Sequence, residues 1–505
     1  METTIIEKIR KNHYELIREI GYPPEQRPSS RIYPKGLRKT RWTLFQLLSM
    51  HPNPKKILFL GATLGGDILG AVESGITVTV LDRDQEILDE LNNLNTKIQC
   101  INSDANNLPE MEKFDIIFIS PWWVINVNRS KISWGHHIEN VLHYLQPDGS
   151  LFIYGLISKP NGLLMKLTGC PVSTEFRHKL LLVPNRQIEL LLNERGLLKT
   201  VYHVYRDYIN PHYVFASKFE GKHLAGLDFE KSSHWKCQVL GWLSGIFEFL
   251  KVPYSRLYPA TLLCFHKNQV GFNSLDPMWL KVSKQIVTSI GEYDGKLRYF
   301  RHSSKNGTWS SEQEIMQYVS TNKYIQKHIN IPLANVVVSG VPSLIYPFID
   351  GQMISNQESV KYGEQVINFL QELSAVEAPE FLPSGYKTLK ELISKNFNGD
   401  NFTNNQLDAI EALERLQQKD SFNYITHGDL YPSNFLIRNS DQNLIIIDWA
   451  QTYKGHPLLD WWIYRYTKEI PDHDPEIPDV LRLGLDKQNL EDLWLVWKSA
   501  YKVSI

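Results

Sequence analysis

The sequence predicts two domains, of which the first is an α/β domain with a doubly wound parallel sheet. The chain has 505 residues, more than one hydrophobic core usually serves, so domains of roughly 200 to 300 residues are expected. In the first half, short apolar runs alternate with helix-like segments, the pattern of parallel strands covered on both faces. These runs are 56–60, 77–81, 98–102, 114–119 and 150–154.

The overall composition excludes several classes of protein. Lys and Arg total 54 against 55 Asp and Glu, so no general attraction to nucleic acid or anionic membrane is expected. Cys100, Cys170, Cys237 and Cys264 form no C-x-x-C pair, which argues against disulfides and zinc and fits a reducing cytoplasm. Residues 1–20 resemble an amphipathic helix rather than a signal peptide. With no run of ~20 apolar residues, we expect a soluble cytoplasmic protein without a transmembrane segment.

Small and acidic residues follow the first three strands, where ligands of a parallel sheet bind. The run 61–66, with Gly61 and Gly65, lets the backbone approach a ligand at a helix N-terminus. Asp82 follows the second strand, where a carboxylate can accept both hydroxyls of a ribose. Asp104 follows the third strand and could accept a hydrogen bond from an adenine amino group. These positions therefore specify a ligand site in addition to the fold.

At this point the sequence resembles the class I S-adenosylmethionine-dependent methyltransferases, over about residues 30 to 267. The matching features are the glycine loop, the ribose acid Asp82, the adenine acid Asp104 and the segment 140–149 ahead of the fifth strand. The resemblance implies a Rossmann-like domain over residues 1–267 with S-adenosylmethionine as its cofactor. It also implies further elements, which are a helix at 184–196, closing strands at 200–205 and 261–266, and a partly helical insertion at 207–258.

The sequence departs from that family at two positions. Phe59 replaces the acid usual within the first strand, and Thr63 replaces the middle glycine of the loop. The alternative is a Rossmann-like domain that binds NAD or no ligand. NAD fits less well, because Asp104 would then have no role.

The sequence gives weaker evidence about the methyl acceptor. The segment 120–123, Ser-Pro-Trp-Trp, is similar to the motif with which amino-methylating enzymes hold a target nitrogen, although its third position differs. The alternative is a strand end with a packed aromatic lid. An acceptor pocket could be lined by aromatic and histidine side chains, with a histidine as base or in a purely structural role. These side chains are Trp122, Trp123, Trp134, His136 and His137.

In the second half, the loop 427–434 and the triplet 447–449 carry residues suited to phosphoryl transfer. That reaction needs a hydroxyl held in line with a γ-phosphate, and metal ions that neutralise charge. Asp429 can accept the hydroxyl's proton or orient the hydroxyl. Asn434 and Asp448 supply the neutral and anionic oxygen ligands that Mg²⁺ prefers. A turn followed by a buried strand, the alternative, would not require these residues together.

Residues 268–505 resemble the aminoglycoside phosphotransferase and choline kinase superfamily. The resemblance implies a two-lobed α+β domain of protein-kinase-like topology, with ATP and Mg²⁺ as cofactors. The segment 344–351 resembles the hinge between lobes, where adenine bonds to backbone groups at alternate residues. Pro347 keeps its carbonyl as the acceptor there, while Ile349 donates its N–H. Asp460 matches a family position that we interpret as structural, tying down the catalytic loop.

The small lobe is expected to hold the phosphates. Ser283, in the expected phosphate loop, could reach a β-phosphate. Arg301 stands where the family usually has its phosphate-binding lysine, with Glu314 as the expected ion-pair partner and Glu312 as a fallback. An arginine keeps the charge and can grip phosphate bidentately, but its fork is not equivalent to an ammonium.

The leading hypothesis is a bifunctional tailoring enzyme. It would phosphorylate a hydroxyl of a small molecule or glycan and methylate by means of S-adenosylmethionine. The alternative, which Phe59, Thr63 and Arg301 keep open, is that one domain is a non-catalytic binding or scaffold module, as in a kinase with a degenerate methyltransferase-like domain. A third hypothesis is a choline or sugar kinase with a degenerate N-terminal domain. We interpret a group of tryptophans as core rather than as a cage for quaternary ammonium, and these are Trp461, Trp462, Trp494 and Trp497.

Overall fold

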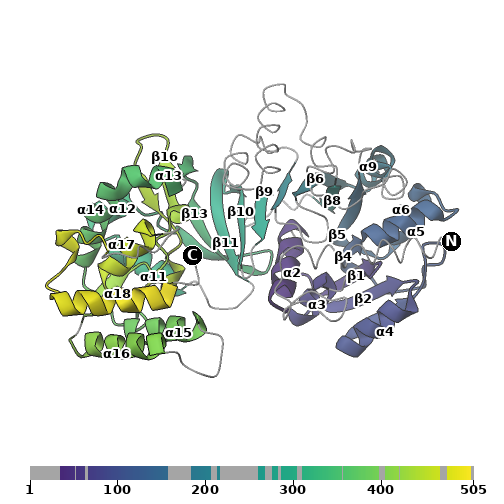
Figure 1. The fold of residues 1–505 in the computed structure, drawn as a ribbon. Coiled ribbons are helices and arrows are strands. Elements are labelled where there is room, and N and C mark those ends of the chain that lie inside the picture. The colour runs from purple at the N-terminus through teal and green to yellow at the C-terminus, as the bar shows by residue number, and fades with distance from the viewer. Residues whose placement is uncertain are drawn as a thin grey trace. The chain divides into compact units, whose positions relative to one another are not determined.

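The computed structural model consists of two compact units (Figure 1). Unit 1 comprises residues 1–306 and 334–348, and unit 2 comprises residues 307–333 and 349–505. The structure describes 35–49, 51, 53–62, 66–156, 183–205, 213–216, 260–267, 276–282, 286–303, 310–354, 356–396, 404–419, 421–466 and 475–501. Some predictions fall outside these residues, namely those on 1–20, Thr63, Gly65, Cys170, Cys237, Ser283 and most of 207–258.

The N-terminal part of unit 1 is the predicted Rossmann-like α/β structure. Its parallel strands are β1 (Lys56–Leu60), β2 (Thr77–Asp82), β3 (Ile98–Asn102), β4 (Phe114–Ile119) and β5 (Leu145–Leu156). They lie in the order β3-β2-β1-β4-β5. Because the order reverses between β1 and β4, the carboxyl ends of these two strands mark the expected ligand crevice.

Helices cover both faces of this sheet, and successive residues of each strand point alternately into the two cores that result. One core joins Phe59 and Val80 to α2 (Lys35–Ser49), α3 (Gly66–Glu73) and α4 (Gln85–Leu94). The other joins Leu58 and Leu81 to the helices on the opposite face. Those helices are α5 (Pro121–Arg129), α6 (Trp134–His143) and α9 (Asn185–Glu194).

The predicted helix and closing strands are present at the end of this sheet. Helix α9 is followed by β6 (Leu197–Tyr205), and β8 (Ala260–Lys267) lies between β5 and β6, antiparallel to both. The sequence predicts a partly helical insertion between these strands. Within it, the structure describes the strand β7 (Tyr213–Ala216), which pairs with β6.

The sheet continues beyond β7 into the segment predicted as the kinase small lobe. Strand β9 pairs antiparallel with β7, so that Val214 lies opposite Leu280. The strands that follow are β9 (Asp276–Val282), β10 (Ile286–Tyr293), β11 (Lys296–Ser303), β12 (Ala334–Val338) and β13 (Val341–Pro347). Among the described residues the full order is β12-β13-β11-β10-β9-β7-β6-β8-β5-β4-β1-β2-β3. The small lobe and the Rossmann-like half therefore share one hydrogen-bonded sheet.

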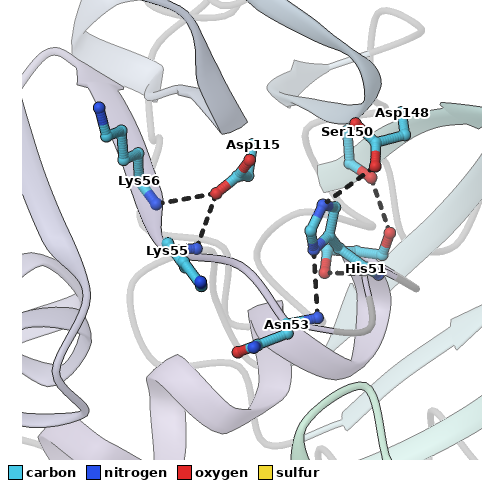
Figure 2. Close-up of polar contacts among 8 residues, drawn as sticks. His51, Asn53, Lys55, Lys56, Asp115, Asp148 and Ser150 are labelled. Atoms are coloured by element: carbon cyan, nitrogen blue, oxygen red, sulfur yellow. Dashed lines mark hydrogen bonds and ion pairs between the residues drawn. The ribbon is translucent and has the colours of Figure 1, made fainter.

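Polar contacts fasten the segment between α2 and β1 to neighbouring strands (Figure 2). The Asp115 carboxylate, near the start of β4, accepts the backbone N–H groups of Lys55 at 2.7 Å and Lys56 at 2.9 Å. The Ser150 hydroxyl, on β5, donates to the carbonyl of Ser49 at 2.7 Å. Asp115 and Lys56 lie near the amino ends of β4 and β1, the end of the strands opposite the expected ligand crevice. We therefore assign these contacts a structural role.

Unit 2 is mainly helical and forms the predicted large lobe of a two-lobed α+β kinase-like fold. Its helices are α11 (Ser310–Val319), α12 (Lys323–Lys327), α13 (Asn356–Ser359), α14 (Gly363–Ser374), α15 (Gly385–Asn396), α16 (Asn404–Gln418), α17 (Pro457–Arg465) and α18 (Lys487–Tyr501). Its strands are β14 (Gly351–Met353), β15 (Tyr424–Thr426), β16 (Phe435–Arg438), β17 (Leu444–Ile446) and β18 (Tyr453–Gly455). They form the small sheets β14-β16-β17 and β15-β18.

The tryptophans of α17 and α18 belong to the core of unit 2. Trp494 and Trp497 stack with ring centroids 4.9 Å apart, and Trp462 meets Trp494 edge-on at 5.0 Å. These rings and Trp461 are all buried, which confirms the core interpretation. Within the part of the chain that the structure describes, no helix combines the length and apolar character needed to cross a membrane.

Candidate functional site

A buried carboxylate holds the loop that follows β15. Asp460, in the first turn of α17, accepts the backbone N–H of His427 at 2.6 Å and that of Gly428 at 2.9 Å. Asp460 is fully buried. Burial raises the pKa of its carboxyl to about 7, while the two backbone hydrogen bonds act in the opposite direction. These contacts confirm that Asp460 ties down the loop.

Gly428 is required by the close approach of this loop to a neighbouring segment. Its φ is +79°, a conformation that side chains other than glycine rarely adopt. A Cβ at this position would lie 2.5 Å from the carbonyl oxygen of Gln451 and 2.9 Å from the ring of Tyr453. The loop backbone therefore packs directly against the segment that follows Asp448.

Asp429 and Asn434 are in direct contact, as the spacing of the motif predicts. The Asn434 amide donates to Asp429 Oδ2 at 3.0 Å and to the Asp429 carbonyl at 2.7 Å. Burial raises the pKa of Asp429 to about 6, the hydrogen bond from Asn434 lowers it, and the charge of Asp448 raises it. A carboxylate with a pKa near neutrality, fixed in orientation, suits a general base.

His427 links the loop that carries Asp429 to the segment before Asp448. Its Nε2 lies 3.1 Å from the carbonyl of Ile447, and its Nδ1 lies 3.3 Å from the N–H of Asp429. A carbonyl only accepts and an N–H only donates, so the ring is the neutral Nε2–H tautomer. Burial lowers the pKa of His427 to about 4. His427 therefore acts as a fixed structural bridge rather than as a base.

Asp448 adopts a left-handed backbone conformation with φ of 66°. Such strain in a residue other than glycine persists only where surrounding structure enforces it, and it often marks a functional position. The N–H of Ile447 donates to the carbonyl of Asn434 at 3.0 Å, which ties together the two segments that carry the expected metal ligands. A carboxylate and an amide oxygen held on adjacent segments fit a hard divalent cation such as Mg²⁺.

Three of the expected cofactor residues, Gly61, Asp82 and Asp104, lie at the carboxyl ends of β1, β2 and β3. Gly61 has φ of +85°, and a Cβ there would lie 2.2 Å from the hydroxyl of Ser120. Asp82 is buried, and its two carboxylate oxygens accept the N–H groups of Ala62 at 2.7 Å and Asp84 at 2.9 Å. Each carboxylate oxygen has more than one lone pair, so both can still accept a ribose hydroxyl.

Asp104 lies beside Asp82 at the neighbouring strand end. The N–H of Ser103 donates to the carbonyl of Asp82 at 3.0 Å, which joins the ends of β3 and β2. Asp104 is partly exposed, and its Oδ1 accepts the N–H of Asn106 at 2.8 Å. The structure therefore brings together Gly61, Asp82 and Asp104 as the sequence predicts.

The segment after β4 is packed rather than open. Ser120 caps α5 by accepting the N–H of Trp123, and the Trp123 indole donates to His137 Nε2 at 3.0 Å. Both Trp123 and His137 are fully buried, and burial lowers the pKa of His137 to about 4. Trp134 meets the His137 ring edge-on at 6.1 Å. These contacts favour the structural interpretation of His137, whereas His136 is exposed.

The residues predicted to bind phosphate and to form the hinge belong to both units. Arg301 lies on β11 in unit 1 and is buried. In unit 2, Glu314 is exposed and Glu312 is 2% exposed. Pro347 ends β13, and Ile349 is the first residue after the passage into unit 2. The predicted hinge therefore coincides with the boundary between the units.

A buried polar network beside Arg301 was not predicted. The ring of His302 lies between the hydroxyls of Ser289 on β10 and Ser343 on β13, each at 2.7 Å. The Ser343 hydroxyl donates to the carbonyl of Val341, so His302 Nδ1 must donate to it and Nε2 must accept from Ser289. Burial lowers the pKa of His302 to about 3. No sequence signal sets His302 apart, because β11 carries several other polar residues.

A family model and a curated relative match part of this chain in sequence. Residues 297–496 match the model of the phosphotransferase enzyme family. A curated relative is the EKC/KEOPS complex subunit bud32 of Dictyostelium discoideum, which is 23% identical over 175 residues, or 34% of this chain. The chain spans about half, 54%, of the length of that relative.

Solved structures of two kinds are similar to this chain. The plantazolicin methyltransferase BpumL in complex with SAH is 15% identical, with 46% of this chain and 83% of that chain covered and a TM-score of 0.29. The apo form of a thermostable mutant of aminoglycoside phosphotransferase APH(4)-Ia is 16% identical, with 46% and 88% covered and a TM-score of 0.34.

Proposed function

Because residues 297–496 match the phosphotransferase enzyme family, we propose that this chain transfers the γ-phosphoryl group of ATP to a hydroxyl of a small molecule or glycan. The observation that carries this proposal is the contact between Asp429 and Asn434, with strained Asp448 on the segment bonded to Asn434. A general base and two oxygen ligands are thereby held within one preorganised loop system. Phosphoryl transfer depends mainly on such positioning.

In this proposal Asp429 takes the proton of the acceptor hydroxyl as that oxygen bonds to phosphorus. The Asn434 amide orients the carboxylate, and Asp460 holds the backbone on which Asp429 stands. Asn434 and Asp448 would hold Mg²⁺, which when bound neutralises charge on the phosphates. The pKa of Asp429, raised by burial to about 6, leaves it mostly ionised at pH 7 and still basic enough to receive a proton.

The nucleotide would contact the predicted hinge segment and the small-lobe strands. The carbonyl of Pro347 and the N–H of Ile349 would contact adenine, and Ser283 and Arg301 would contact the phosphates. Glu314 is the partner that the sequence predicts for Arg301, with Glu312 as the fallback.

We further propose that the Rossmann-like half binds S-adenosylmethionine in the cytoplasm. It would methylate the acceptor that the kinase phosphorylates, or another compound of the same pathway. Gly61 and Gly65 would admit the cofactor to the crevice, Asp82 would accept its ribose hydroxyls, and Asp104 would accept the adenine amino group. The juxtaposition of Gly61, Asp82 and Asp104 at adjacent strand ends supports this part of the proposal.

A second candidate function is a kinase whose Rossmann-like half is a non-catalytic scaffold. The contacts of His137 favour it, because this buried ring accepts a hydrogen bond from Trp123 and its pKa is lowered to about 4. It is therefore unsuited to remove a proton from a methyl acceptor at neutral pH. A scaffold would keep the fold of the crevice and lack the acceptor site.

Isothermal titration with S-adenosylmethionine and, separately, Mg-ATP distinguishes these candidates. The variants are Asp82→Ala and Asp448→Ala, with exposed Asp89→Ala and Asp441→Ala as matched controls for the loss of a carboxylate. We expect two independent binding events, each lost only in its own site variant. Mg-ATP binding without S-adenosylmethionine binding would refute the methyltransferase part. No Mg-ATP binding to the wild type would refute the kinase itself.

A further inference from the structure

Helix α2 contacts strands of both halves of the shared sheet. It precedes β1 in sequence, yet it contacts β9, β10, β11 and β13 as well as β8 and α3 (Figure 1). The ring of Phe45 meets Phe118 on β4 at 5.0 Å and Phe152 on β5 at 6.2 Å, both edge-on. Phe45 therefore anchors α2 on the Rossmann-like strands.

The next residue of α2 contacts the small lobe. The side-chain amide of Gln46 donates to the carbonyl oxygen of Ser339 at 2.7 Å. Ser339 and Gly340 form the turn between β12 and β13, with φ of 48° and 75°, the positive values of a tight type I′ hairpin. Phe45 and Gln46, which are consecutive in α2, therefore contact β4 and β5 on one side and the tip of the β12–β13 hairpin on the other.

Apolar packing extends this connection across the small-lobe sheet. Val287 on β10, Phe300 on β11 and Ile345 on β13 are buried in the same core as Trp42 of α2 and Phe59 of β1. Residues 300 and 302 lie on one face of β11, and Arg301 between them faces the other side. The face that α2 covers is thus opposite the face on which Arg301 would meet phosphate.

We propose that α2 is a positioning element for the nucleotide site of the kinase, with Gln46 as its principal positioning residue. The proposal rests on the proposed phosphotransferase function. Gln46 fixes the hairpin tip, the hairpin fixes β13, and β13 ends at Pro347, whose carbonyl would contact adenine. The same strand pairs with β11 at Arg301, opposite Leu344. A residue of the N-terminal half therefore sets the geometry of the kinase.

The expected effect is on nucleotide affinity. Without the Gln46 bond, the hairpin would populate arrangements in which Pro347 is misplaced, and apparent affinity falls in proportion to the competent fraction. The loss of a part-buried hydrogen bond corresponds to a rise of about two- to tenfold in the Kd for Mg-ATP. Gln46→Glu keeps the shape of the side chain but sets a carboxylate against the Ser339 carbonyl, so its effect should be larger than that of Gln46→Ala. Gln46→Lys restores a donor and should recover affinity.

The test is isothermal titration of the full chain with Mg-ATP for wild type and these variants. Asp115→Ala is the matched control, because it removes the bonds to Lys55 and Lys56 on the same sheet without touching the small lobe (Figure 2). Hydrogen exchange of residues 338–341 verifies that each variant is folded and shows whether the hairpin tip has loosened.

A purely structural role for α2 would lower stability in the Gln46 variants and the Asp115 variant alike and leave the Kd unchanged. We expect a weaker Kd in Gln46→Ala and Gln46→Glu alone, with recovery in Gln46→Lys. Equal Kd values for wild type and all folded Gln46 variants would overturn the proposal while leaving the kinase in place. Failure of the wild type to bind Mg-ATP would overturn the kinase and this proposal together.

Discussion

Replacement of Asp460 by asparagine tests how the loop that carries Asp429 is held. The wild-type carboxylate accepts two backbone N–H groups, from His427 at 2.6 Å and Gly428 at 2.9 Å, in a fully buried position. Asparagine has the same volume but a single acceptor oxygen, and its amide would face the other N–H. We expect the loop to open locally while the surrounding core stays folded.

The size of this effect follows from the donor that is left unsatisfied. A buried N–H without a partner costs about 1–3 kcal/mol, which corresponds to about 5- to 150-fold faster hydrogen exchange. The assay is exchange at the amides of His427 and Gly428, which report local opening. Asp492→Asn is the control, because it removes a buried carboxylate that pairs with Arg415 elsewhere in unit 2. Unchanged protection in Asp460→Asn, or equal loss in Asp492→Asn, would refute the reasoning.

The pKa of Asp460 adds a dependence on pH to this prediction. Burial raises its pKa from 3.8 to about 7 in the folded state, so the folded chain keeps a proton that the unfolded chain releases between these values. Its contribution to stability is fully present below pH 4 and is lost as pH rises through about 7. The loss is on the order of a few kcal/mol. Asparagine does not titrate, so the Tm advantage of the wild type over Asp460→Asn should shrink from pH 5 to pH 8, and a widening advantage would contradict this account.

Three further substitutions test the loops of the two sites. Gly428→Ala places a Cβ 2.5 Å from a backbone oxygen and should lower the Tm far more than Gly484→Ala. At Gly484 φ is +81° but no described heavy atom lies within 4 Å, so the loss of stability there is only the backbone strain of about 1–2 kcal/mol. Gly61→Ala places a Cβ 2.2 Å from the Ser120 hydroxyl and should abolish S-adenosylmethionine binding in titrations, whereas Gly75→Ala, with no described heavy atom within 4 Å, should bind normally. Asp429→Asn should keep the Kd for Mg-ATP within about threefold and reduce phosphoryl transfer to an acceptor found by screening by about 10²–10⁴-fold; unaltered transfer would exclude Asp429 as the base.

Strands β1 and β4 could be predicted because they are almost wholly buried and mainly apolar, whereas the edge strand β3 is only partly buried and is recognised by its place in the alternation of strands and helices. Strands β1, β3 and β4 have the predicted bounds, and β2 is one residue longer. Strand β5 begins earlier, at Leu145, because its first residues pair with the start of β4. Strand β7 is also apolar, but four residues are too short a run to be distinguished within the insertion, and they form a strand through long-range pairing with β6 and β9.

The kinase motifs could be predicted to converge because the loop is short. Five residues separate Asp429 from Asn434, and the hairpin of β16 and β17 returns the chain to Asp448. The choice between Glu312 and Glu314 depends on which face of α11 is buried, and the helix begins at Ser310, earlier than predicted. The bond from Gln46 to Ser339 spans 293 positions in sequence, and no local pattern carries information about such a contact.

The shared core changes what the fusion of two domains implies about function. Two catalytic domains in one chain ordinarily suggest successive reactions on one substrate. Here α2 supplies a separate reason to keep the N-terminal half, because without it Val287, Phe300 and Ile345 would lose the apolar cover of their face. A kinase of this architecture would keep that half even if it transferred no methyl group. The case for methyl transfer therefore rests on the crevice residues Gly61 and Asp82, and cofactor binding decides between the two proposed functions.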